Sequence, residues 1–304
     1  MKSDIKNIEA SVKSRLQNKA KETNRPYAEV LQYYGMERFL YRFSQSDYAG
    51  QFILKGALMF TVWDIPARRT TVDIDFLGRI DNKVENIESV VRNICKIKVP
   101  DDGLVFDTKT VKGERIKEDA DYEGVRVKFF GFLEKSKIPM QIDVGFGDVI
   151  TPKPSTIDYP TILNFPAPHL QGYTFESVVA EKFEAMIKLG ILNSRMKDFY
   201  DIWLMARQMN FEGKKLATAI KATFENRETQ LPTNAPLFAE EIYNEKSGSA
   251  AMWKAFLRKK QIQIAPDSLE EVAGSIEAFL LEPVKAIATG KEFFKSWRVP
   301  GLWK

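Results

Sequence analysis

The first 35 residues carry two segments in which apolar residues recur at helical spacing. The two sets, separated by Asn24-Arg25-Pro26, are Ile5, Ile8, Val12 and Leu16, and then Tyr27, Val30, Leu31 and Tyr34. Spacings of three and four residues place such side chains on one face of a helix. The proline and its polar neighbours interrupt this pattern. We therefore expect the chain to open with two helices.

A strand, a turn and a short helix are predicted next. The apolar run 52–54 ends at Lys55-Gly56, and 57–63 contains no helix breaker before Pro66 closes the unit. Residues 71–77 alternate between polar and apolar in the manner of a strand. Two further strand candidates, 122–133 and 138–146, are joined by the polar segment 134–137, which predicts a hairpin.

The second half of the chain is predicted to be helical. Pro and Thr are frequent over 151–168, which predicts a long irregular connection. Thr174 is then a candidate N-cap for a helix that stops at Gly190, and another helix should run from about Met196 to Met209. Beyond Gly213 only helical patterns remain, separated by prolines.

We therefore predict an α/β (α+β) fold in which a small mixed sheet is surrounded by helices. A first domain, residues 1–210, would include the N-terminal helices and carry the chemistry. A second domain, residues 211–304, would be a helical bundle.

Composition restricts the chemistry more than it identifies partners. Lys and Arg number 45 against 41 Asp and Glu, so net charge alone indicates no partner, although a local basic cleft is compatible with it. The single cysteine, Cys95, and the single histidine, His169, exclude disulfides and zinc clusters of the Cys/His type. Residues 1–21 show no apolar signal core, and no segment is long and apolar enough for a membrane span. We expect a cytoplasmic protein that uses carboxylates, lysines and hydroxyls.

Asp73 and Asp75 are the first candidate site residues. Residues two apart in a strand point to the same face, about 6 to 7 Å apart, so these carboxylates repel each other unless a cation such as Mg²⁺ neutralises them. The alternative is an edge strand with two solvated aspartates. Gly56, at a strand-to-helix turn, suits phosphate binding. Asp143 faces away from its apolar neighbours and would join the pair if the strands are adjacent.

Lys182 lies within the apolar stripe of the helix that follows Thr174. Either its ammonium snorkels to solvent, or it enters the active cleft and binds phosphate. Lys188, with Glu184 four residues before it, suggests a surface ion pair. Asp198 and Asp201 lie near one helical face, where Lys182, Arg195 or Lys197 would compensate them. Alternatively, Asp198 is an acid favoured by the helix N-terminus.

In order along the chain, these residues resemble the motifs of AbiEii-type nucleotidyltransferases. The motifs are Lys55-Gly56-Ala57-Leu58, Arg69-x-Thr71-x-Asp73-x-Asp75, Ile142-Asp143, Glu181-Lys182 and Arg195-x-Lys197-Asp198-x-x-Asp201. The family contains toxins of bacterial abortive-infection and toxin–antitoxin systems, within the polymerase-beta-like superfamily. The resemblance covers roughly residues 50–205. Ala57 departs from the second small glycine or serine that is frequent in the family.

The resemblance implies roles for particular residues. The metal, Mg²⁺ or Mn²⁺, would be bound by Asp73, Asp75 and Asp143. The nucleotide would be contacted by Gly56, Ala57, Arg69, Thr71, Lys182 and Lys197. The residues implied in catalysis are Asp73, Asp75, Lys182 and Asp198. Arg69, next to Arg68, is alternatively a solvated residue beside the strand.

The implied reaction moves a nucleotide from an NTP to an acceptor. The resemblance favours RNA as the acceptor, at the acceptor end of tRNA, and a cognate antitoxin as a partner. Two other functions stay open at this point. One is a nucleotide- or RNA-binding protein without turnover, which the intact carboxylates disfavour. The other is an enzyme that nucleotidylates a protein.

Overall fold

The computed structural model describes residues 7–66, 69–119, 122–233, 235–244 and 248–304. The chain divides into two compact units. Unit 1 comprises residues 1–63, 71–147 and 155–172, and unit 2 comprises 64–70, 148–154 and 173–304. The helices from residue 173 onward thus cluster with the C-terminal helices, whereas the sequence suggested a division near residue 210. The functional division of the chain stays a prediction.

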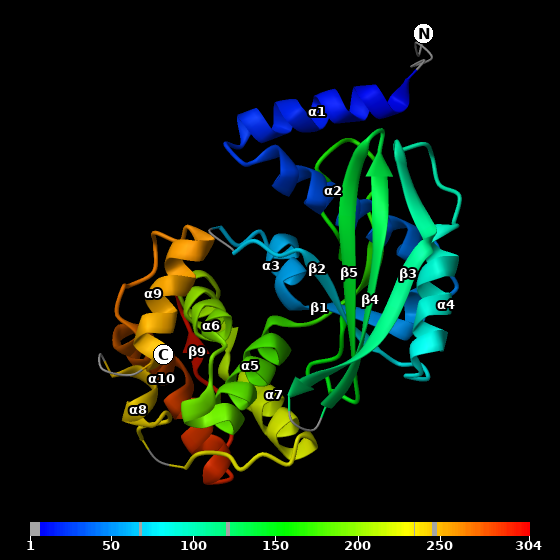
Figure 1. Cartoon of the computed structure of the whole chain (residues 1–304). Helices are drawn as coiled ribbons and strands as arrows, with labels where there is room; N and C mark the ends of the chain where they lie inside the picture. Colours follow the sequence, from blue (N-terminus) through cyan, green and yellow to red (C-terminus); the bar gives the residue numbers. More distant parts are fainter. Residues whose placement is uncertain (1–6, 67–68, 120–121, 234, 245–247) are drawn as a thin grey trace. The chain divides into compact units, whose positions relative to one another are not determined.

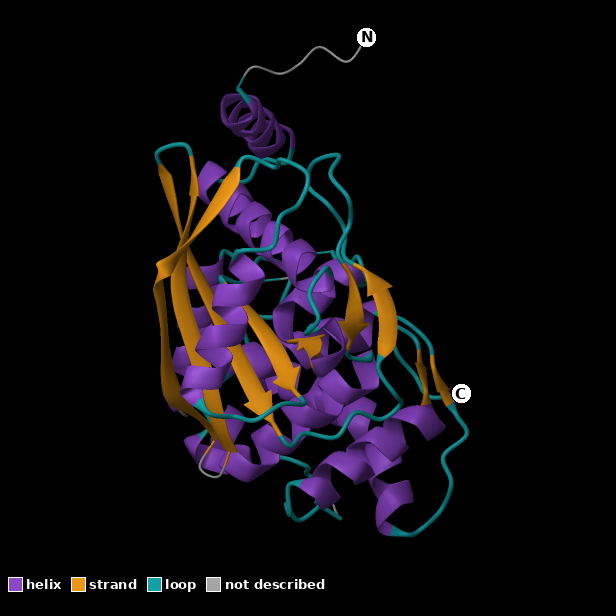
Figure 2. Ribbon diagram, turned by 90° about the vertical axis from the view of Figure 1, so that its right-hand side faces the viewer, coloured by secondary structure: helices purple, strands orange, loops and turns teal. Residues whose placement is uncertain are grey.

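Unit 1 contains a seven-stranded mixed sheet in the order β3-β4-β5-β2-β1-β7-β6 (Figures 1 and 2). Its strands are β1 (Phe52–Lys55), β2 (Asp73–Gly78), β3 (Leu104–Asp119), β4 (Tyr122–Leu133), β5 (Ser136–Phe146), β6 (Ser155–Asp158) and β7 (His169–Gly172). The β2–β5 and β1–β7 pairs are parallel, and the other neighbours are antiparallel. The mixed α/β fold is therefore confirmed, with a larger sheet than expected.

The predicted strands and hairpin are confirmed, with two corrections. The β4–β5 hairpin turns at Glu134 and Lys135, because β5 already begins at Ser136. The segment 151–168 is not wholly irregular, since it contains β6, which pairs with β7. The strand β3 was not predicted, because polar residues occupy much of its length. It forms the outer strand beside β4.

Unit 1 also contains helices, of which α2 (Tyr27–Ser44) and α4 (Val84–Cys95) pack on the face of the sheet to which the apolar side chains of β2 point. The helices are α1 (Ile8–Glu22), α2 (Tyr27–Ser44), α3 (Met59–Val62) and α4 (Val84–Cys95), with short 3₁₀ turns η1 (Ala49–Gln51) and η2 (Gly56–Leu58). Both N-terminal helices are confirmed, while Ile5 lies outside the described residues. On α2, Phe43 packs against Phe76 of β2, with ring centroids 4.9 Å apart. The polar face of β2 is therefore the opposite one.

Buried charges tie α2 into unit 1. The Arg42 guanidinium donates to both carboxylate oxygens of Asp102, over 2.7 and 3.0 Å. Glu37, which is fully buried, accepts from the Ile162 backbone N–H over 2.7 Å and lies 2.9 Å from the Arg38 guanidinium. Burial raises the pKa of Glu37 to about 7 despite the opposing influence of Arg38. Glu37 is thus a buried acid that titrates near neutral pH.

Unit 2 is mainly helical. Its elements are α5 (Phe175–Leu189), η3 (Gly190–Leu192), α6 (Met196–Gln208), β8 (Phe211–Glu212), α7 (Gly213–Asn226), α8 (Glu240–Tyr243), α9 (Gly248–Lys260), α10 (Leu269–Ala288) and β9 (Ser296–Trp297). The expectation of helices alone beyond Gly213 is wrong in one place, because β9 pairs with β8. None of the helices in the described ranges combines the length and apolar character that a bilayer crossing needs.

Helix α5 has the predicted ends. The Thr174 side chain accepts from the Ser177 backbone N–H and caps the helix N-terminus. At the other end Gly190 has φ of 49°, a left-handed conformation in which a side chain is strained. These two residues therefore define the length of the helix that carries Lys182.

Candidate active site

Three carboxylates converge in unit 1. The parallel register of β2 and β5 places Asp75 directly beside Asp143, with Asp73 one step away on the same face of β2. One oxygen from each of Asp73, Asp75 and Asp143 lies within 4.8 Å of the other two. Because β2 lies between β1 and β5, the alternative of an edge strand with solvated aspartates is wrong. The expected adjacency of Asp143 is confirmed.

Each strand contributes groups that hold these carboxylates in place. The Thr71 hydroxyl donates to Asp73. The Arg126 guanidinium on β4 donates to both oxygens of Asp143, over 2.8 and 2.7 Å, and the Gln141 amide donates to the same carboxylate over 3.2 Å. The hydrogen bond with Asp143 raises the pKa of Arg126. Arg126 thus supplies a positive charge beside three negative ones.

Sequence reasoning missed Arg126. The available signal was its position in β4, where it alternates with Val125 and Val127 and so shares a face with the polar residues of its neighbours. The pairing that brings Arg126 opposite Asp143 is fixed by the hairpin register. A hairpin prediction with the correct register would have identified this contact.

The Gly56 turn lies against the Asp75 carboxylate. Gly56 has φ of 73°, and a Cβ built there would fall 2.0 Å from Asp75 Oδ2. Any side chain at this position would therefore collide with the carboxylate and strain the backbone. Glycine therefore allows the turn and the carboxylate to approach each other closely.

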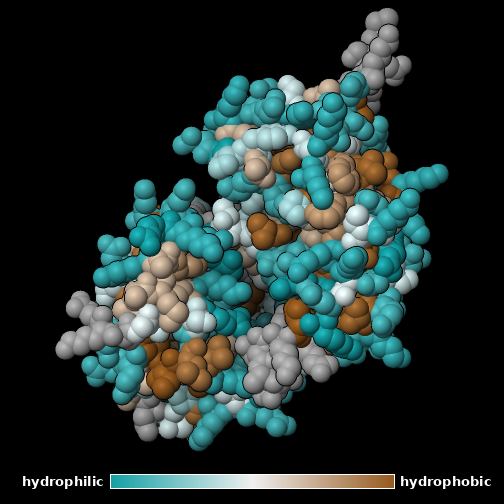
Figure 3. Space-filling model, in the orientation of Figure 1, coloured by the Kyte–Doolittle hydropathy of each residue, from teal (hydrophilic) through white to brown (hydrophobic). Residues whose placement is uncertain are grey.

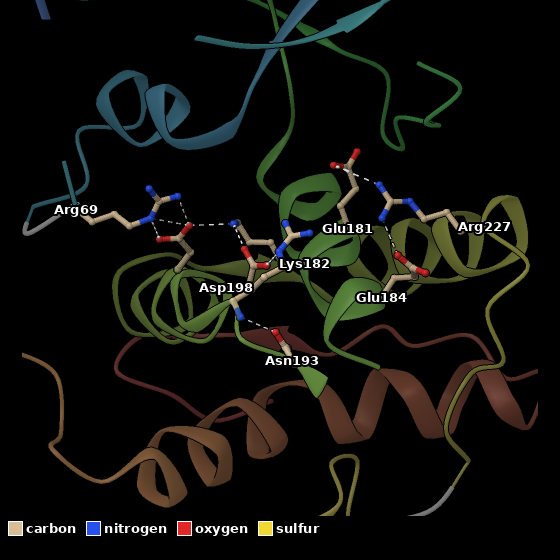
Figure 4. A network of polar contacts seen from close by, with 9 residues as sticks. Arg69, Glu181, Lys182, Glu184, Asn193, Asp198 and Arg227 are labelled. Atoms are coloured by element: carbon tan, nitrogen blue, oxygen red, sulfur yellow. Dashed lines mark hydrogen bonds and ion pairs between the residues drawn. The ribbon is translucent and has the colours of Figure 1, made fainter. Parts of the chain in front are cut away.

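A second charged cluster lies in unit 2, between α5, α6 and the segment 64–70 (Figure 4). The Lys182 ammonium is 2.6 Å from Asp198 and 2.9 Å from Asp201. Arg69 donates to both oxygens of Asp201 over 3.0 Å, and Arg195 lies 2.7 Å from Asp198. The predicted compensation of the two acids by cations is confirmed. Three cations meet two carboxylates, so the cluster has a surplus of positive charge.

Burial and charge oppose each other in this cluster. Burial by itself raises the pKa of Asp198 and Asp201, but the neighbouring cations outweigh it and both pKa values fall below the ordinary range of aspartate. Burial lowers the pKa of Lys182, but the two aspartates outweigh it and the pKa is raised. All three groups are therefore charged at neutral pH.

Two alternative interpretations, one for Lys182 and one for Arg69, are wrong. The Lys182 side chain is 12% exposed and its ammonium is held by carboxylates, so it does not snorkel to solvent. The Arg69 side chain is 11% exposed and paired, so it is not a solvated residue, while Arg68 lies outside the described residues.

The expectation that Glu184 lies at the surface is also wrong. Glu184 is fully buried, its carboxylate lies 2.6 Å from Arg227, and it accepts from the Thr229 hydroxyl. Figure 4 shows Arg227 between Glu184 and Glu181. Arg227 lies at the C-terminal end of α7, far from Glu184 in the sequence. The four-residue spacing of Glu184 and Lys188 could not reveal this contact.

The predicted site residues divide between the two units. Gly56, Ala57, Thr71, Asp73, Asp75 and Asp143 belong to unit 1, and Arg69, Lys182, Lys197 and Asp198 belong to unit 2. Ala57 is buried, and Lys197 is exposed at the start of α6. Their contacts with a nucleotide stay predictions.

Comparison with known proteins identifies a sequence family. A family model described as nucleotidyl transferase AbiEii toxin, type IV TA system, matches residues 38–274. No curated protein matches the chain.

Two solved structures, both from Helicobacter pylori, are similar to the chain at 14% sequence identity. JHP933 has a TM-score of 0.46, with 83% of this chain and 90% of that chain covered. A proposed nucleotidyltransferase has a TM-score of 0.47, with 84% and 95% covered. TM-scores below 0.5 do not establish a shared fold, so the sequence match alone carries the family assignment.

Proposed function

Because the chain belongs to the nucleotidyltransferase AbiEii toxin family of type IV toxin–antitoxin systems, we propose that it transfers a nucleotide from an NTP to a hydroxyl acceptor at the carboxylate cluster of unit 1. The observation that carries this proposal is the convergence of Asp73, Asp75 and Asp143 within 4.8 Å. Three carboxylates held together at this electrostatic cost favour an enzyme over a nucleotide- or RNA-binding protein without turnover.

The donor set fits a divalent metal. Asp73, Asp75 and Asp143 offer only carboxylate oxygens, which Mg²⁺ and Mn²⁺ prefer, and their spacing suits a shared ion. When bound, Mg²⁺ would polarise the phosphate oxygens and lower the pKa of the acceptor hydroxyl. Arg126 already offsets part of the negative charge at Asp143, so this carboxylate is held in place before a metal arrives.

The chain's own residues would then position the triphosphate. Backbone N–H groups of the Gly56-Ala57 turn would receive phosphate oxygens, and Thr71 would keep Asp73 oriented. The acceptor hydroxyl oxygen forms a bond to the α-phosphorus, the bond to the β-phosphate oxygen breaks, pyrophosphate leaves with the electron pair, and the hydroxyl proton passes to water.

We propose from the family assignment that the second charged cluster, which lies within unit 2, takes part in nucleotide binding. With three cations against two carboxylates, it can attract phosphate without requiring Lys182 to leave Asp198 and Asp201. We propose that Asp198 positions Lys182, and that Arg69 and Lys197 contribute positive charge toward the triphosphate.

We also propose a biological setting, based on the family. The acceptor would be RNA, at the acceptor end of tRNA, in the cytoplasm, with a cognate antitoxin as a partner. The sheet of unit 1 would be a polymerase-beta-like core, followed by a helical C-terminal domain. A protein acceptor is the alternative, and the same experiment separates the two.

The test is incubation of the protein with each labelled NTP, Mg²⁺ or Mn²⁺, and total RNA. We expect label in an RNA band, no label with Asp75→Asn, and normal labelling with Asp81→Asn, whose carboxylate is exposed and paired with Lys83. Label in a protein band would identify a protein acceptor instead. Absence of label with every NTP, or full activity of Asp75→Asn, would contradict the proposal.

A further inference from the structure

Positive charge is concentrated in one helix of unit 2. Residues 248–266, which contain α9, include Lys254, Arg258, Lys259 and Lys260 and no acidic residue. The chain has 45 basic and 41 acidic residues, so the remaining chain has 45 − 4 = 41 basic against 41 acidic residues. The excess of basic over acidic residues in the whole chain is therefore equal to the number of basic residues in this helix.

Three cations of α9 face solvent. Lys254, Arg258 and Lys259 are exposed, and no carboxylate of the described ranges forms an ion pair with them. Elsewhere in unit 2, exposed lysines do pair with glutamates: Lys214 with Glu292, Lys215 with Glu212 and Lys295 with Glu282. The three α9 cations thus keep their charge available for a ligand.

The opposite side of α9 fixes the helix in unit 2. Trp253 and Leu257 are buried, and the Trp253 indole N–H donates to the Pro266 carbonyl over 2.9 Å. Phe256 packs against Tyr200 of α6, with ring centroids 6.0 Å apart. At the C-terminal end, Lys260 donates to the Thr70 carbonyl over 3.2 Å. The exposed cations therefore project from a helix whose position is set by its apolar side.

The side chains beside the three exposed cations indicate which polyanion this surface binds. Beside the cations, Ala251, Met252 and Ala255 are exposed, and Figure 3 shows a strip of weakly hydrophobic surface over α9 next to hydrophilic side chains. No aromatic side chain of α9 is exposed, so the helix offers no platform on which unpaired bases can stack. Cations beside alanine and methionine side chains suit contacts with the phosphates of a duplex instead.

We propose that the exposed face of α9 binds the phosphate backbone of a base-paired region of the RNA acceptor. This inference rests on the proposed transfer to RNA and adds where a folded RNA is held. Thr70, whose carbonyl accepts a hydrogen bond from Lys260, lies three residues before Asp73 in the chain. Contacts to phosphates alone would make binding independent of base sequence and strongly dependent on salt.

The test measures binding of a fluorescein-labelled RNA hairpin by fluorescence anisotropy, without nucleotide or divalent cation, between about 50 and 200 mM NaCl. The triple variant Lys254→Gln, Arg258→Gln, Lys259→Gln is compared with Lys214→Gln, Lys215→Gln, Lys295→Gln. The control changes the net charge equally, in the same unit, at lysines that are already paired.

We expect the α9 variant to bind the hairpin at least about tenfold more weakly, with the salt slope reduced by about 2 to 3, and the control to stay within about twofold of the parent. Equal weakening in both triple variants, no binding by the parent, or tighter binding of an unpaired RNA of the same length would overturn the inference. Binding of NTP and Mn²⁺ is measured separately. Its retention in the α9 variant shows that only RNA binding was lost, and its absence in the parent speaks against the proposed function.

Discussion

Replacing Lys182 with methionine removes one charge from the buried cluster of unit 2 and keeps most of the side-chain volume. In the parent, the ammonium lies 2.6 Å from Asp198 and 2.9 Å from Asp201, and both carboxylates are at most 2% exposed. Removing one partner of a buried ion pair costs about 3 to 5 kcal/mol, because the remaining charge stays desolvated. Arg69 and Arg195 still compensate the acids, so we expect about 3 kcal/mol.

A matched control separates burial from distance. Lys214 lies 2.7 Å from Glu292, but the two side chains are 59% and 61% exposed. A surface ion pair of this kind contributes at most about 1 kcal/mol, so Lys214→Met should cost less than that. If distance rather than burial decided the energy, both substitutions would have the same effect.

Urea denaturation at neutral pH, followed by tryptophan fluorescence, measures both costs. Four of the five tryptophans, Trp203, Trp253, Trp297 and Trp303, belong to unit 2, so the signal reports mainly on the unit that contains the cluster. The cations lower the pKa of Asp201, so its contribution to stability is complete above the ordinary pKa of aspartate and is lost only as pH falls below it. Neutral pH therefore shows the full effect.

A double-mutant cycle with Asp201→Asn tests whether the energy belongs to the pair. Lys182→Met should cost less in the Asp201→Asn background than in the parent, since one of its two carboxylates has lost its charge. A cost below about 1 kcal/mol for Lys182→Met, or the same cost in both backgrounds, would refute the reasoning.

Three further substitutions test other parts of unit 1. Arg126→Met should lower stability without metal and enlarge the Mn²⁺-induced rise in Tm, because a cation competing for Asp143 is removed. The control Lys128→Met, two residues along β4, should change neither quantity. An unchanged rise in Tm for Arg126→Met would count against this role of Arg126. Gly56→Ala should abolish the Mn²⁺-dependent rise in Tm, because its Cβ would displace the Asp75 carboxylate, and a normal rise would contradict that geometry. Since the pKa of Glu37 is raised, the parent should lose stability as pH rises from the ordinary value toward 7, by up to about 1.4 kcal/mol per pH unit, and Glu37→Gln should remove that loss in urea melts at about pH 5 and pH 8.

Local patterns in the sequence predicted the elements that carry the carboxylates. The alternation around Asp73 and Asp75 gave their shared face, and the apolar neighbours of Asp143 gave its direction. Strand pairing was not available from the sequence, because register depends on contacts between segments far apart in the chain. The parallel β2–β5 pair, which joins Asp75 to Asp143, therefore had to be seen in the structure.

The charged partners were the least predictable feature. Helical spacing placed Asp198 and Asp201 near one face, but it offered a surface role for Glu184 that burial excludes. Arg227 reaches Glu184 from 43 residues away, and Arg126 reaches Asp143 across a hairpin. Arginines with long side chains bond to distant segments, so periodicity along one element does not reveal their partners.

The segment 64–70 has a consequence for how the protein is made. It belongs to unit 2, where Arg69 is paired with Asp201, although it precedes the carboxylate strand of unit 1. Arg69 is synthesised 132 residues before Asp201, which corresponds to roughly 7 to 26 s of translation at 5 to 20 residues per second. Strand β1 precedes Arg69, and the other strands of the seven-stranded sheet are synthesised within that interval. Strand β2 can therefore join its neighbours before Asp201 is available to Arg69. This order delays completion of the Arg69 ion pair until 201 of the 304 residues have been synthesised.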